Sequence, residues 1–344
     1  MQNIGIIGCG RIAQERHIPE YLSNHNSNIA GFYDFNRDRT KALAEKYGAK
    51  AYSSVEEMLD DPQIDAVSVC TANDSHADVT IQALHKKKHV LCEKPMAMHL
   101  ADCIAMNNAA AENNRRLMIG QNQRFTKAHI KARQLLEQGV IGDIITFKTT
   151  FGHSGPETWS IDAQKSNWFF DAKKAGMGAI ADLGIHKTDL IQFLTASRVV
   201  ETTAKVVTID KRNADGTPIG VDDNVICIYK LESGAIGTMC ASWSYYGKED
   251  NSTILYGKTG IMRIYADAAY SIVIEKKNGD TVKYALDKIQ TNDNQTKSGL
   301  IDAFVESLEN NTEVPVTGTQ VLHAMKAVFA SIESSRSGKT IEIE

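Results

Sequence analysis

A glycine-rich turn near the N-terminus constrains the fold of this chain more than any other feature. The turn reads Gly8-Cys9-Gly10-Arg11-Ile12-Ala13 and joins an apolar run at 3–8 to an amphipathic segment at 12–23. This G-x-G-x-x-A pattern links the first strand of a dinucleotide-binding βαβ unit to its helix. The first glycine permits a tight turn, the second lets the backbone approach a pyrophosphate, and the small third residue lets helix and strand pack closely. The free N–H groups at the start of the helix attract phosphate.

An acidic residue stands where such a site needs one. Asp34 ends a second apolar run at 29–34 and follows Ala13 by 21 residues, which is the spacing of the residue that binds the ribose. A carboxylate accepts hydrogen bonds from ribose hydroxyls and repels a 2′-phosphate, so NAD is favoured over NADP. Arg37 and Arg39 either keep NADP open as the alternative or are solvated surface charges. The predicted cofactor contacts of this region are Gly8, Gly10, Arg11, Ile12, Asp34 and Arg39.

Strand-like and helix-like segments alternate over the first third of the chain. Apolar runs recur at 66–71, 90–93 and 117–120, and helical patterns lie between them. Repeated strand–helix–strand units predict a doubly wound parallel sheet with right-handed crossovers. We therefore expect a dinucleotide-binding Rossmann domain over residues 1–122.

The pattern changes beyond residue 122. Helical patterns at 127–138 and 179–194 are followed by strand-like runs between 199 and 285, several of them separated by tight turns. Consecutive strands joined by tight turns are typical of antiparallel sheets. Residues 123–344 are therefore predicted to form an α+β domain on a large, mostly antiparallel sheet.

Composition excludes several classes of protein. Lys and Arg number 38 against 42 Asp and Glu, a net charge of −4, so no basic surplus indicates nucleic-acid binding. No apolar run reaches the ~18 residues that a membrane-spanning helix needs. The six cysteines lack a CxxC pair, which is typical of buried, reduced thiols in a cytoplasmic protein. The expected partner is a small molecule.

A lysine follows one of the apolar runs directly. In Glu93-Lys94-Pro95, Lys94 comes after the run at 90–92, at the carboxyl end of a parallel strand, where ligands of such sheets bind. Pro95 restricts Lys94 to an extended conformation, and a cis bond between them would aim its side chain. A lone lysine after a strand is otherwise an ordinary surface residue.

A second group of reactive side chains follows Gly176-Met177-Gly178. Asp182 and His186 are four residues apart, on one face of the predicted helix. Gly184 between them costs about 1 kcal/mol relative to alanine, so something approaches the helix closely there, and a ligand is one candidate. Asp182 and His186 are alternatively a local charge pair, a satisfied core pair or two metal ligands. No HExxH motif or clear third ligand accompanies them, which disfavours a metal site.

Taken together and in this order, the motifs resemble those of the Gfo/Idh/MocA oxidoreductases, over essentially the whole chain. They are G-x-G-x-x-A at 8–13, E-K-P at 93–95 and D-x-G-x-H at 182–186. The segment at 71–76 also resembles the T-P-N-x-x-H cofactor loop of the family, with Ala72 in place of proline, and Met177 interrupts the family's triple glycine. The resemblance implies further cofactor contacts at Thr71, Asn73, His76, Glu93, Lys94 and Asn122, and a catalytic set of Lys94, Asp182 and His186.

The resemblance also implies the chemistry, a hydride transfer between nicotinamide C4 and a secondary alcohol or ketone. A neutral His186, with an ordinary pKa of about 6.5, would accept the hydroxyl proton. Lys94 would hydrogen-bond the reacting oxygen and stabilise its negative charge. Asp182 would orient either the imidazole or the substrate hydroxyl.

An aromatic segment at 152–174 is the candidate substrate region. Flat rings stack on sugar faces and short polar groups bind hydroxyls, although the same residues suit a loop pinned to the core. Arg124 either meets an anionic substituent or ties the two domains together by a salt bridge; an uncharged polyol is favoured because other phosphate-binding clusters are missing. The candidate substrate contacts are Arg124, His153, Trp159, Trp168, Asp182 and His186.

Three functions stay open from the sequence. The first is an NAD(P)-dependent sugar or cyclitol dehydrogenase, including activity like that of a myo-inositol 2-dehydrogenase. The second is an NAD-dependent glycosidase that acts through transient oxidation and would release aglycone without net NADH. The third is a non-catalytic, dinucleotide-sensing regulator, which would need only the motifs of the first domain.

Alternating apolar residues in the second domain bear on assembly. Ile226, Ile228, Met239 and Ala241 form such a pattern, which is consistent with an apolar sheet face unless all four lie in the core of the monomer. The family resemblance implies that residues 123–344 bind the substrate and pair through such a face in a homodimer or homotetramer.

Overall fold

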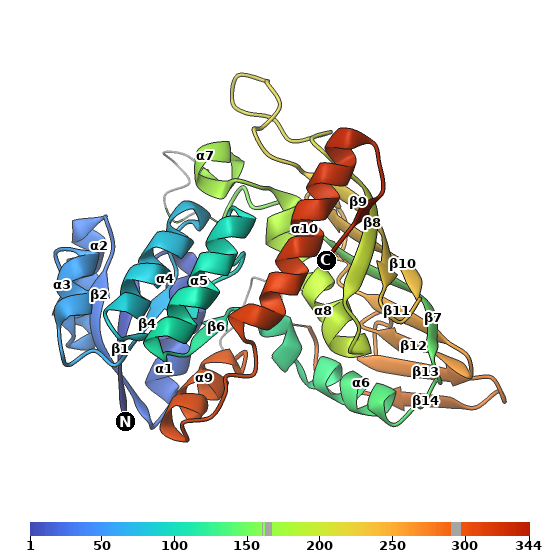
Figure 1. Cartoon of the computed structure of the whole chain (residues 1–344), viewed down its shortest axis with the longest axis horizontal. Coiled ribbons are helices and arrows are strands. Elements are labelled where there is room, and N and C mark those ends of the chain that lie inside the picture. Colours follow the sequence, from blue (N-terminus) through green and yellow to red (C-terminus); the bar gives the residue numbers. More distant parts are fainter. Residues whose placement is uncertain (160, 162–166, 290–296) are drawn as a thin grey trace.

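The computed structural model describes residues 1–159, 161, 167–289 and 297–344, and their strands form two sheets flanked by helices (Figure 1). All neighbouring strands of the first sheet are parallel, in the order β3-β2-β1-β4-β5-β6. This confirms the predicted doubly wound sheet. Its strands are β1 (Gln2–Ile7), β2 (Ser27–Tyr33), β3 (Lys50–Ala51), β4 (Ala66–Val69), β5 (His89–Cys92) and β6 (Leu117–Ile119).

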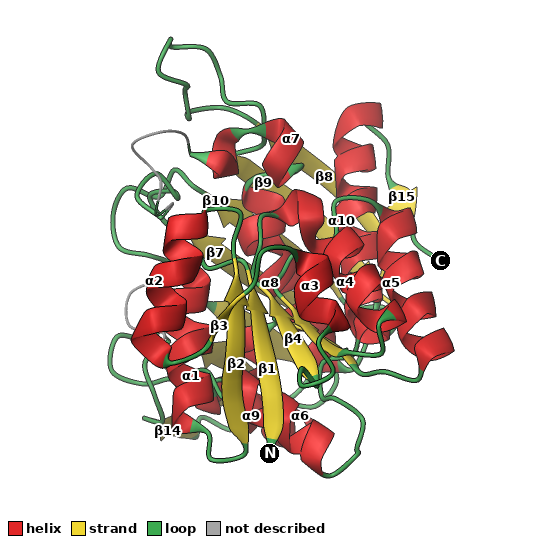
Figure 2. Ribbon diagram, turned by 90° about the vertical axis from the view of Figure 1, so that its left-hand side faces the viewer, coloured by secondary structure: helices red, strands yellow, loops and turns green. Residues whose placement is uncertain are grey.

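The helices of the first domain start where the sequence supplies caps. Asn36 accepts a hydrogen bond from the Arg39 N–H at the start of α2, and Ser54 accepts one from the Glu57 N–H at the start of α3. The first helix begins with a wide π-helical turn, Ala13–His17, before it continues as α1 (Ile18–Ser23). The others are α2 (Arg37–Tyr47), α3 (Val55–Asp60), α4 (His76–His85) and α5 (Leu100–Asn113), and Figure 2 shows them around the parallel strands.

The second sheet has the order β14-β13-β12-β11-β7-β10-β9-β8-β15. Its neighbours are antiparallel except for β7 and β10, which run parallel. The expectation of a large, mostly antiparallel sheet is thus confirmed. Its strands are β7 (Ile144–Gly152), β8 (Val199–Val207), β9 (Asn224–Leu231), β10 (Ile236–Ser242), β11 (Thr253–Gly257), β12 (Gly260–Ile264), β13 (Ile272–Lys276), β14 (Thr281–Tyr284) and β15 (Ile341–Glu342).

The helices after residue 122 serve both domains. They are α6 (Lys127–Glu137), α7 (Ala172–Ala175), α8 (Ile185–Thr195), α9 (Leu300–Glu309) and α10 (Gly318–Ser337). Helix α10 packs against β8 and α8 of the second domain and against α5 of the first. Helix α9 lies on α1 and β1, and the Ser298 N–H beside it donates to Glu20 Oε1 at 2.7 Å. The chain therefore returns to the first domain after β14, before β15 completes the second sheet. None of the described helices is long and apolar enough to cross a membrane.

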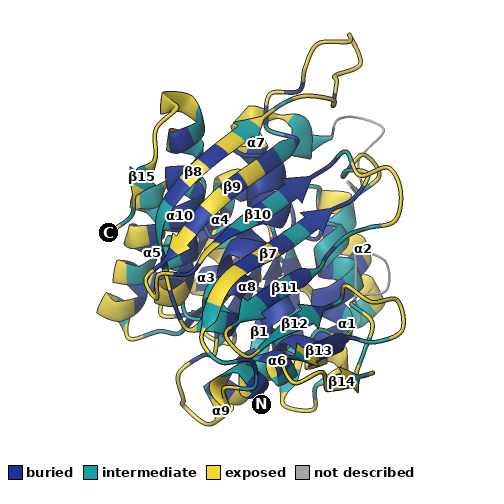
Figure 3. Cartoon of the chain, turned by 90° about the vertical axis from the view of Figure 1, so that its right-hand side faces the viewer, coloured by how far each residue is buried: buried dark blue, intermediate teal, exposed yellow. Residues whose placement is uncertain are grey.

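The two faces of the second sheet differ, and Figure 3 shows exposed bands on β8 and β9. Ile226 and Ile228 are 58% and 51% exposed, whereas Met239 and Ala241 are buried. The prediction that these four residues share one face of the sheet is wrong. The two isoleucines of β9 lie on the outer face, and Met239 and Ala241 of β10 lie on the face that packs against the helices. The register explains this, because β9 residues 226 and 228 pair with β10 residues 240 and 238, which shifts Met239 and Ala241 to the other side.

Candidate active site

A cavity of about 1000 Å³ lies between the two domains. The carboxyl ends of the parallel strands line one side, and residues of the second domain line the other. In doubly wound sheets this edge is where ligands bind. Sixteen of the predicted site residues line the cavity: Gly8, Gly10, Arg11, Ile12, Asp34, Arg39, Thr71, Asn73, His76, Glu93, Lys94, Asn122, Trp159, Trp168, Asp182 and His186. Arg124 and His153 are not among its lining residues.

The two glycines of the N-terminal turn are required for different reasons. Gly8 has φ +87°, and a Cβ there would lie 2.6 Å from the backbone of Cys70 and Thr71, so the fold itself demands glycine. Gly10 has an ordinary φ, and a Cβ there would meet no atom of the described chain within 4 Å. Since Gly10 lines the cavity, the open space beside it fits the close approach of a pyrophosphate to the backbone.

Asp34 lies at the same end of the cavity with a fixed carboxylate. Its Oδ2 accepts a hydrogen bond from the Cys9 N–H at 2.7 Å, and its Oδ1 accepts one from the Asn36 N–H at 2.8 Å. The Arg39 guanidinium lies 3.3 Å from Oδ2. Arg39 is therefore not a solvated surface charge, and the Asp34 carboxylate lines the cavity at the end of β2.

The loop at 71–76 and the E-K-P segment hold one another. The Lys94-Pro95 peptide bond is cis, and the His76 ring lies between the carbonyl oxygens of Pro95 at 2.8 Å and Thr71 at 3.1 Å. Asn73 Nδ2 donates to the Ala175 carbonyl at 2.9 Å, which ties this loop to α7 of the second domain. The side chains of His76 and Asn73 thus shape the cavity through bonds to the protein.

Glu93 anchors the base of the cavity through partners that the sequence analysis missed. Its Oε1 lies 2.9 Å from His17 Nε2 and 3.6 Å from Arg16 Nη1. Burial raises the pKa of Glu93, but the hydrogen bond with His17 and the charge of Arg16 outweigh it and lower the pKa to about 2. The carboxylate also accepts the Lys94 N–H at 3.2 Å. No local pattern marks Arg16 and His17, because the π-helical turn directs them toward β5.

Lys94 and Asp182 form an ion pair that joins the two domains at the cavity. Lys94 Nζ donates to Asp182 Oδ1 at 2.8 Å and to its carbonyl oxygen at 3.0 Å. Trp243 Nε1 donates to Asp182 Oδ2 at 3.0 Å, so both carboxylate oxygens are bound. No described contact joins this carboxylate to the His186 ring. Asp182 therefore orients Lys94 rather than the imidazole, and the buried Trp243 is a further site residue that sequence reasoning missed.

His186 lines the cavity without a fixed partner. Its Nδ1 is buried and has no hydrogen-bond partner in the part of the chain that the structure describes. Burial, followed by the charges of Lys94 and Arg16, holds the pKa of His186 well below its ordinary value. The imidazole is therefore neutral at pH 7 and able to accept a proton. Within the same described residues, no group of His, Cys, Asp and Glu side chains could hold a metal ion.

Contacts with the second sheet position the helix that carries Asp182 and His186. The partly buried Asp222 carboxylate accepts the N–H groups of Gly178 and Ile180, both at 2.7 Å. A Cβ on Gly178 would lie 1.8 Å from the Asp222 carbonyl oxygen, which explains this glycine. The sequence predicted that something approaches the helix closely at Gly184. The neighbour is the second sheet rather than a ligand, because a Cβ at Gly184 would lie 3.3 Å from Met239 Cε.

The candidate substrate residues separate into two groups. Trp168 stacks on Phe169 at 4.0 Å between ring centroids, and Trp159 meets Phe169 edge-on at 5.9 Å; both tryptophans line the cavity. Arg124 instead donates to both carboxylate oxygens of Asp189, at 2.7 and 2.5 Å. This salt bridge lies within the second domain, so it does not tie the two domains together. Because the guanidinium is already paired with Asp189, it is not available to an anionic substituent of the substrate.

Two family models match the chain. The model described as "Oxidoreductase family, NAD-binding Rossmann fold" matches residues 2–121, and the GFO/IDH/MocA C-terminal domain matches residues 129–263. The chain belongs to the Gfo/Idh/MocA oxidoreductase family. The resemblance of the motifs is thereby confirmed, and the first domain is an NAD-binding Rossmann domain of an oxidoreductase.

Individual relatives agree with this membership over the full chain. A myo-inositol 2-dehydrogenase of Thermotoga maritima is 25% identical over 99% of this chain and 98% of its own length. The crystal structure of an aldose-aldose oxidoreductase from Caulobacter crescentus, complexed with glycerol, has a TM-score of 0.83 at 25% identity and 99% coverage of both chains. An oxidoreductase domain protein from Kribbella flavida superposes with a TM-score of 0.87 at 23% identity over 100% of both chains, and shows the same fold.

Proposed function

We propose that this chain is an NAD-dependent dehydrogenase that interconverts a secondary alcohol and a ketone on an uncharged sugar or cyclitol. The single observation that carries the proposal is the Lys94–Asp182 pair, 2.8 Å apart, beside a neutral His186 in the cavity that Gly10 and Asp34 also line. The names of the Thermotoga and Caulobacter relatives, a myo-inositol 2-dehydrogenase and an aldose-aldose oxidoreductase, support the substrate class.

The residues of the cavity divide the proton chemistry between them. The nicotinamide ring, when bound, supplies the hydride acceptor or donor at its C4. The Lys94 ammonium hydrogen-bonds the reacting oxygen and stabilises the negative charge that develops on it as the hydroxyl proton leaves in oxidation, or as the hydride arrives at the carbonyl carbon in reduction. His186 accepts the hydroxyl proton in oxidation and returns it in reduction. Asp182 and Trp243 hold Lys94 in place.

The walls of the cavity favour an uncharged ring as substrate. Trp159 and Trp168 offer flat apolar faces, on which a sugar or cyclitol stacks through its axial C–H groups. Arg124, the candidate for an anionic substituent, is bound by Asp189 and lies away from the lining.

A panel of sugars and cyclitols, incubated with NAD and monitored for NADH absorbance, tests this function. Turnover of at least one member with NAD, and slower turnover with NADP, is the expected result, because Asp34 repels a 2′-phosphate. Release of aglycone from glycosides without net NADH would instead identify the glycosidase. No reaction with either cofactor, on any member, would favour the regulator and contradict the proposal.

The kcat/KM for alcohol oxidation is expected to stay at its neutral-pH value when the pH is lowered to about 6.5. Because the pKa of His186 is lowered in the folded protein, the neutral, proton-accepting form persists as the pH falls through about 6.5, the ordinary histidine value. The acid limb of kcat/KM against pH is therefore expected below pH ~6.5. Initial rates measured across this range check the prediction, and a limb at or above the ordinary value would contradict it.

The open face of the second sheet supports assembly into a homodimer or homotetramer, which we propose. Ile226, Ile228 and Ile236 are each more than half exposed on neighbouring strands, and such patches mark interfaces. Light scattering should give a mass of two or four chains, and replacing Ile228 by lysine should lower it. A monomeric native protein would contradict the proposal.

We also propose a cytoplasmic location. All six cysteines are free, and five of them are buried, which is typical of proteins kept in a reducing compartment. Disulfide-bonded protein isolated from cells would contradict this location.

A further inference from the structure

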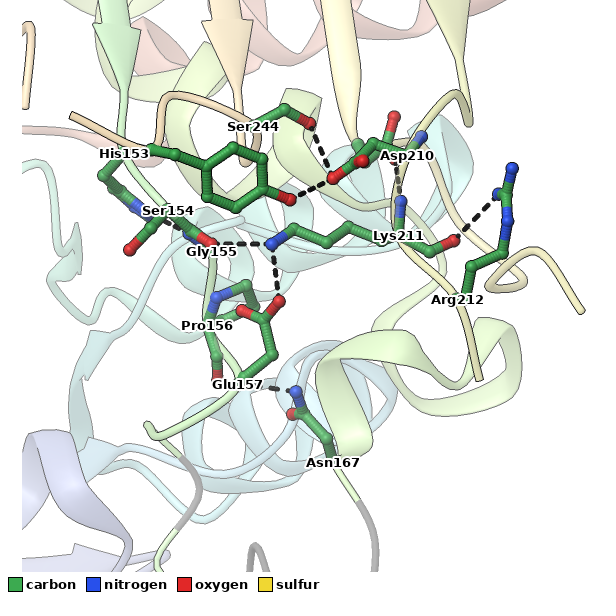
Figure 4. A network of polar contacts seen from close by, with 12 residues as sticks. His153, Ser154, Gly155, Pro156, Glu157, Asn167, Asp210, Lys211, Arg212 and Ser244 are labelled. Carbon is green, nitrogen blue, oxygen red and sulfur yellow. Dashed lines mark hydrogen bonds and ion pairs between the residues drawn. The ribbon is translucent and has the colours of Figure 1, made fainter. Parts of the chain in front are cut away.

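A nearly buried lysine outside the catalytic cluster joins three loops at the rim of the second domain (Figure 4). Lys211 is 6% exposed, and its Nζ donates to the Ser154 carbonyl at 2.6 Å and to the Glu157 carboxylate. The ammonium also lies 4.9 Å from the centre of the Tyr246 ring. A buried ammonium is costly unless it is paired, and Lys211 does not line the cavity. Its contacts therefore point to a role in holding the loops.

The backbone of Lys211 is itself fixed by a buried carboxylate. Asp223 accepts the N–H groups of Ile209 at 2.8 Å, Asp210 at 2.7 Å and Lys211 at 2.6 Å. The preceding residue is Asp222, which holds the start of the helix that carries Asp182 and His186. Two consecutive aspartates thus connect the Lys211 loop and the catalytic helix to the same point of the sheet. The backbone and the side chain of Lys211 are therefore both held in place by hydrogen bonds.

The segment whose Ser154 and Glu157 bind Lys211 ends at the wall of the cavity. It runs from His153 to Trp159, and Trp159 N–H donates to the Pro156 carbonyl at 3.0 Å, which closes a turn. The Trp159 ring lies 4.7 Å from the His153 ring and lines the cavity. Trp159 follows Glu157 by two residues, so the contact of Lys211 with the Glu157 carboxylate leaves little freedom for the ring.

We propose that Lys211 and Glu157 are positioning residues that set Trp159 as the stacking wall for the substrate ring. The inference rests on the proposed function and deepens it. An aromatic wall that is ordered before binding lowers the entropic cost of association. The pair touches neither the proton-transfer residues nor the glycine turn, so it affects the affinity for the sugar or cyclitol and leaves the chemical step intact.

Two variants test the pair kinetically. Lys211→Met keeps the length of the side chain without its charge, and Glu157→Gln removes the opposite charge. Each is expected to raise the KM for the best polyol about tenfold, with kcat within about threefold of the native value, the signature of lost uniform binding. NAD affinity should be unchanged. Lys258→Met is the matched control, because Lys258 forms a comparable pair with Asp143 at 2.8 Å on the open surface.

A spectroscopic measurement separates this inference from the proposed function. The chain has three tryptophans, so 5-fluorotryptophan labelling gives three ¹⁹F signals that Trp→Phe variants assign. Lys211→Met and Glu157→Gln should both move the Trp159 signal and leave that of Trp243 in place, whether or not any polyol is turned over. An unmoved Trp159 signal in both variants would overturn the positioning role. A moved signal with unchanged KM, or a fall in kcat and NAD affinity as large as the rise in KM, would overturn the role in substrate affinity.

Discussion

Replacement of Lys94 by methionine is expected to lower kcat for alcohol oxidation by about 10²–10⁴-fold. Lys94 Nζ is bound by the Asp182 carboxylate and lines the cavity, and a methionine of similar length cannot stabilise a developing oxyanion. The NAD dissociation constant should stay similar, because the glycine turn and Asp34 are untouched. Steady-state rates with the best polyol, together with NAD titrations, measure the two quantities separately.

A second lysine of the same cavity provides the control for this experiment. Lys174 also lines the cavity but is exposed and lies on α7, away from the Asp182 carboxylate. Lys174→Met removes the same charge from the cavity and should keep kcat within a few-fold of the native value. Equal losses in the two variants would show that overall positive charge, rather than Lys94 in its position, supports turnover. Native turnover in Lys94→Met would reject the catalytic assignment.

Replacement of Gly10 by alanine is expected to weaken NAD binding by about tenfold or more, roughly 1.4 kcal/mol, without destabilising the ligand-free protein. A Cβ at Gly10 meets no described protein atom within 4 Å and projects where the pyrophosphate would pass. The melting temperature without cofactor should therefore stay at the native value, while the stabilisation that NAD adds should shrink. Thermal melts with and without NAD check both parts.

Two other glycines define the limits of this prediction. Gly8→Ala should lower the melting temperature even without NAD, since its φ of +87° and the backbone 2.6 Å from a Cβ strain the fold itself. Gly247→Ala should change neither property, because a Cβ there also meets nothing within 4 Å of the described chain and Gly247 does not line the cavity. NAD binding of native strength in Gly10→Ala would show that no ligand group approaches this turn closely.

Features that depend on neighbouring residues along the chain were accessible from the sequence alone. The glycine turn and Asp34 follow from spacing, and the parallel sheet follows from repeated strand–helix–strand units. The place of Lys94 at the cavity follows from its position after a buried strand. Each of these predictions uses only local backbone preference, periodicity and chain order.

Partner choice was decided by the tertiary structure. Lys94 meets Asp182 across 88 residues of sequence, and neither the Trp243 bond to that carboxylate nor the Glu93 contact with His17 has a local signal. The sequence left two roles open for Arg124, contact with an anionic substituent or a salt bridge between the domains. In the structure it is paired with Asp189 of its own domain. The faces of β9 and β10 were assigned wrongly because their relative register is a property of the paired strands.

By itself, the sequence determined that this protein has a dinucleotide-binding domain, and it identified Lys94, Asp182 and His186 as candidate reactive residues. Only the tertiary structure decided which of those residues touch one another, which are neutral and which are occupied elsewhere. The physical reason is that hydrogen-bond partners and burial arise where distant segments pack together, and the lowered pKa of His186 exists only once Lys94, Arg16 and the sheet enclose it.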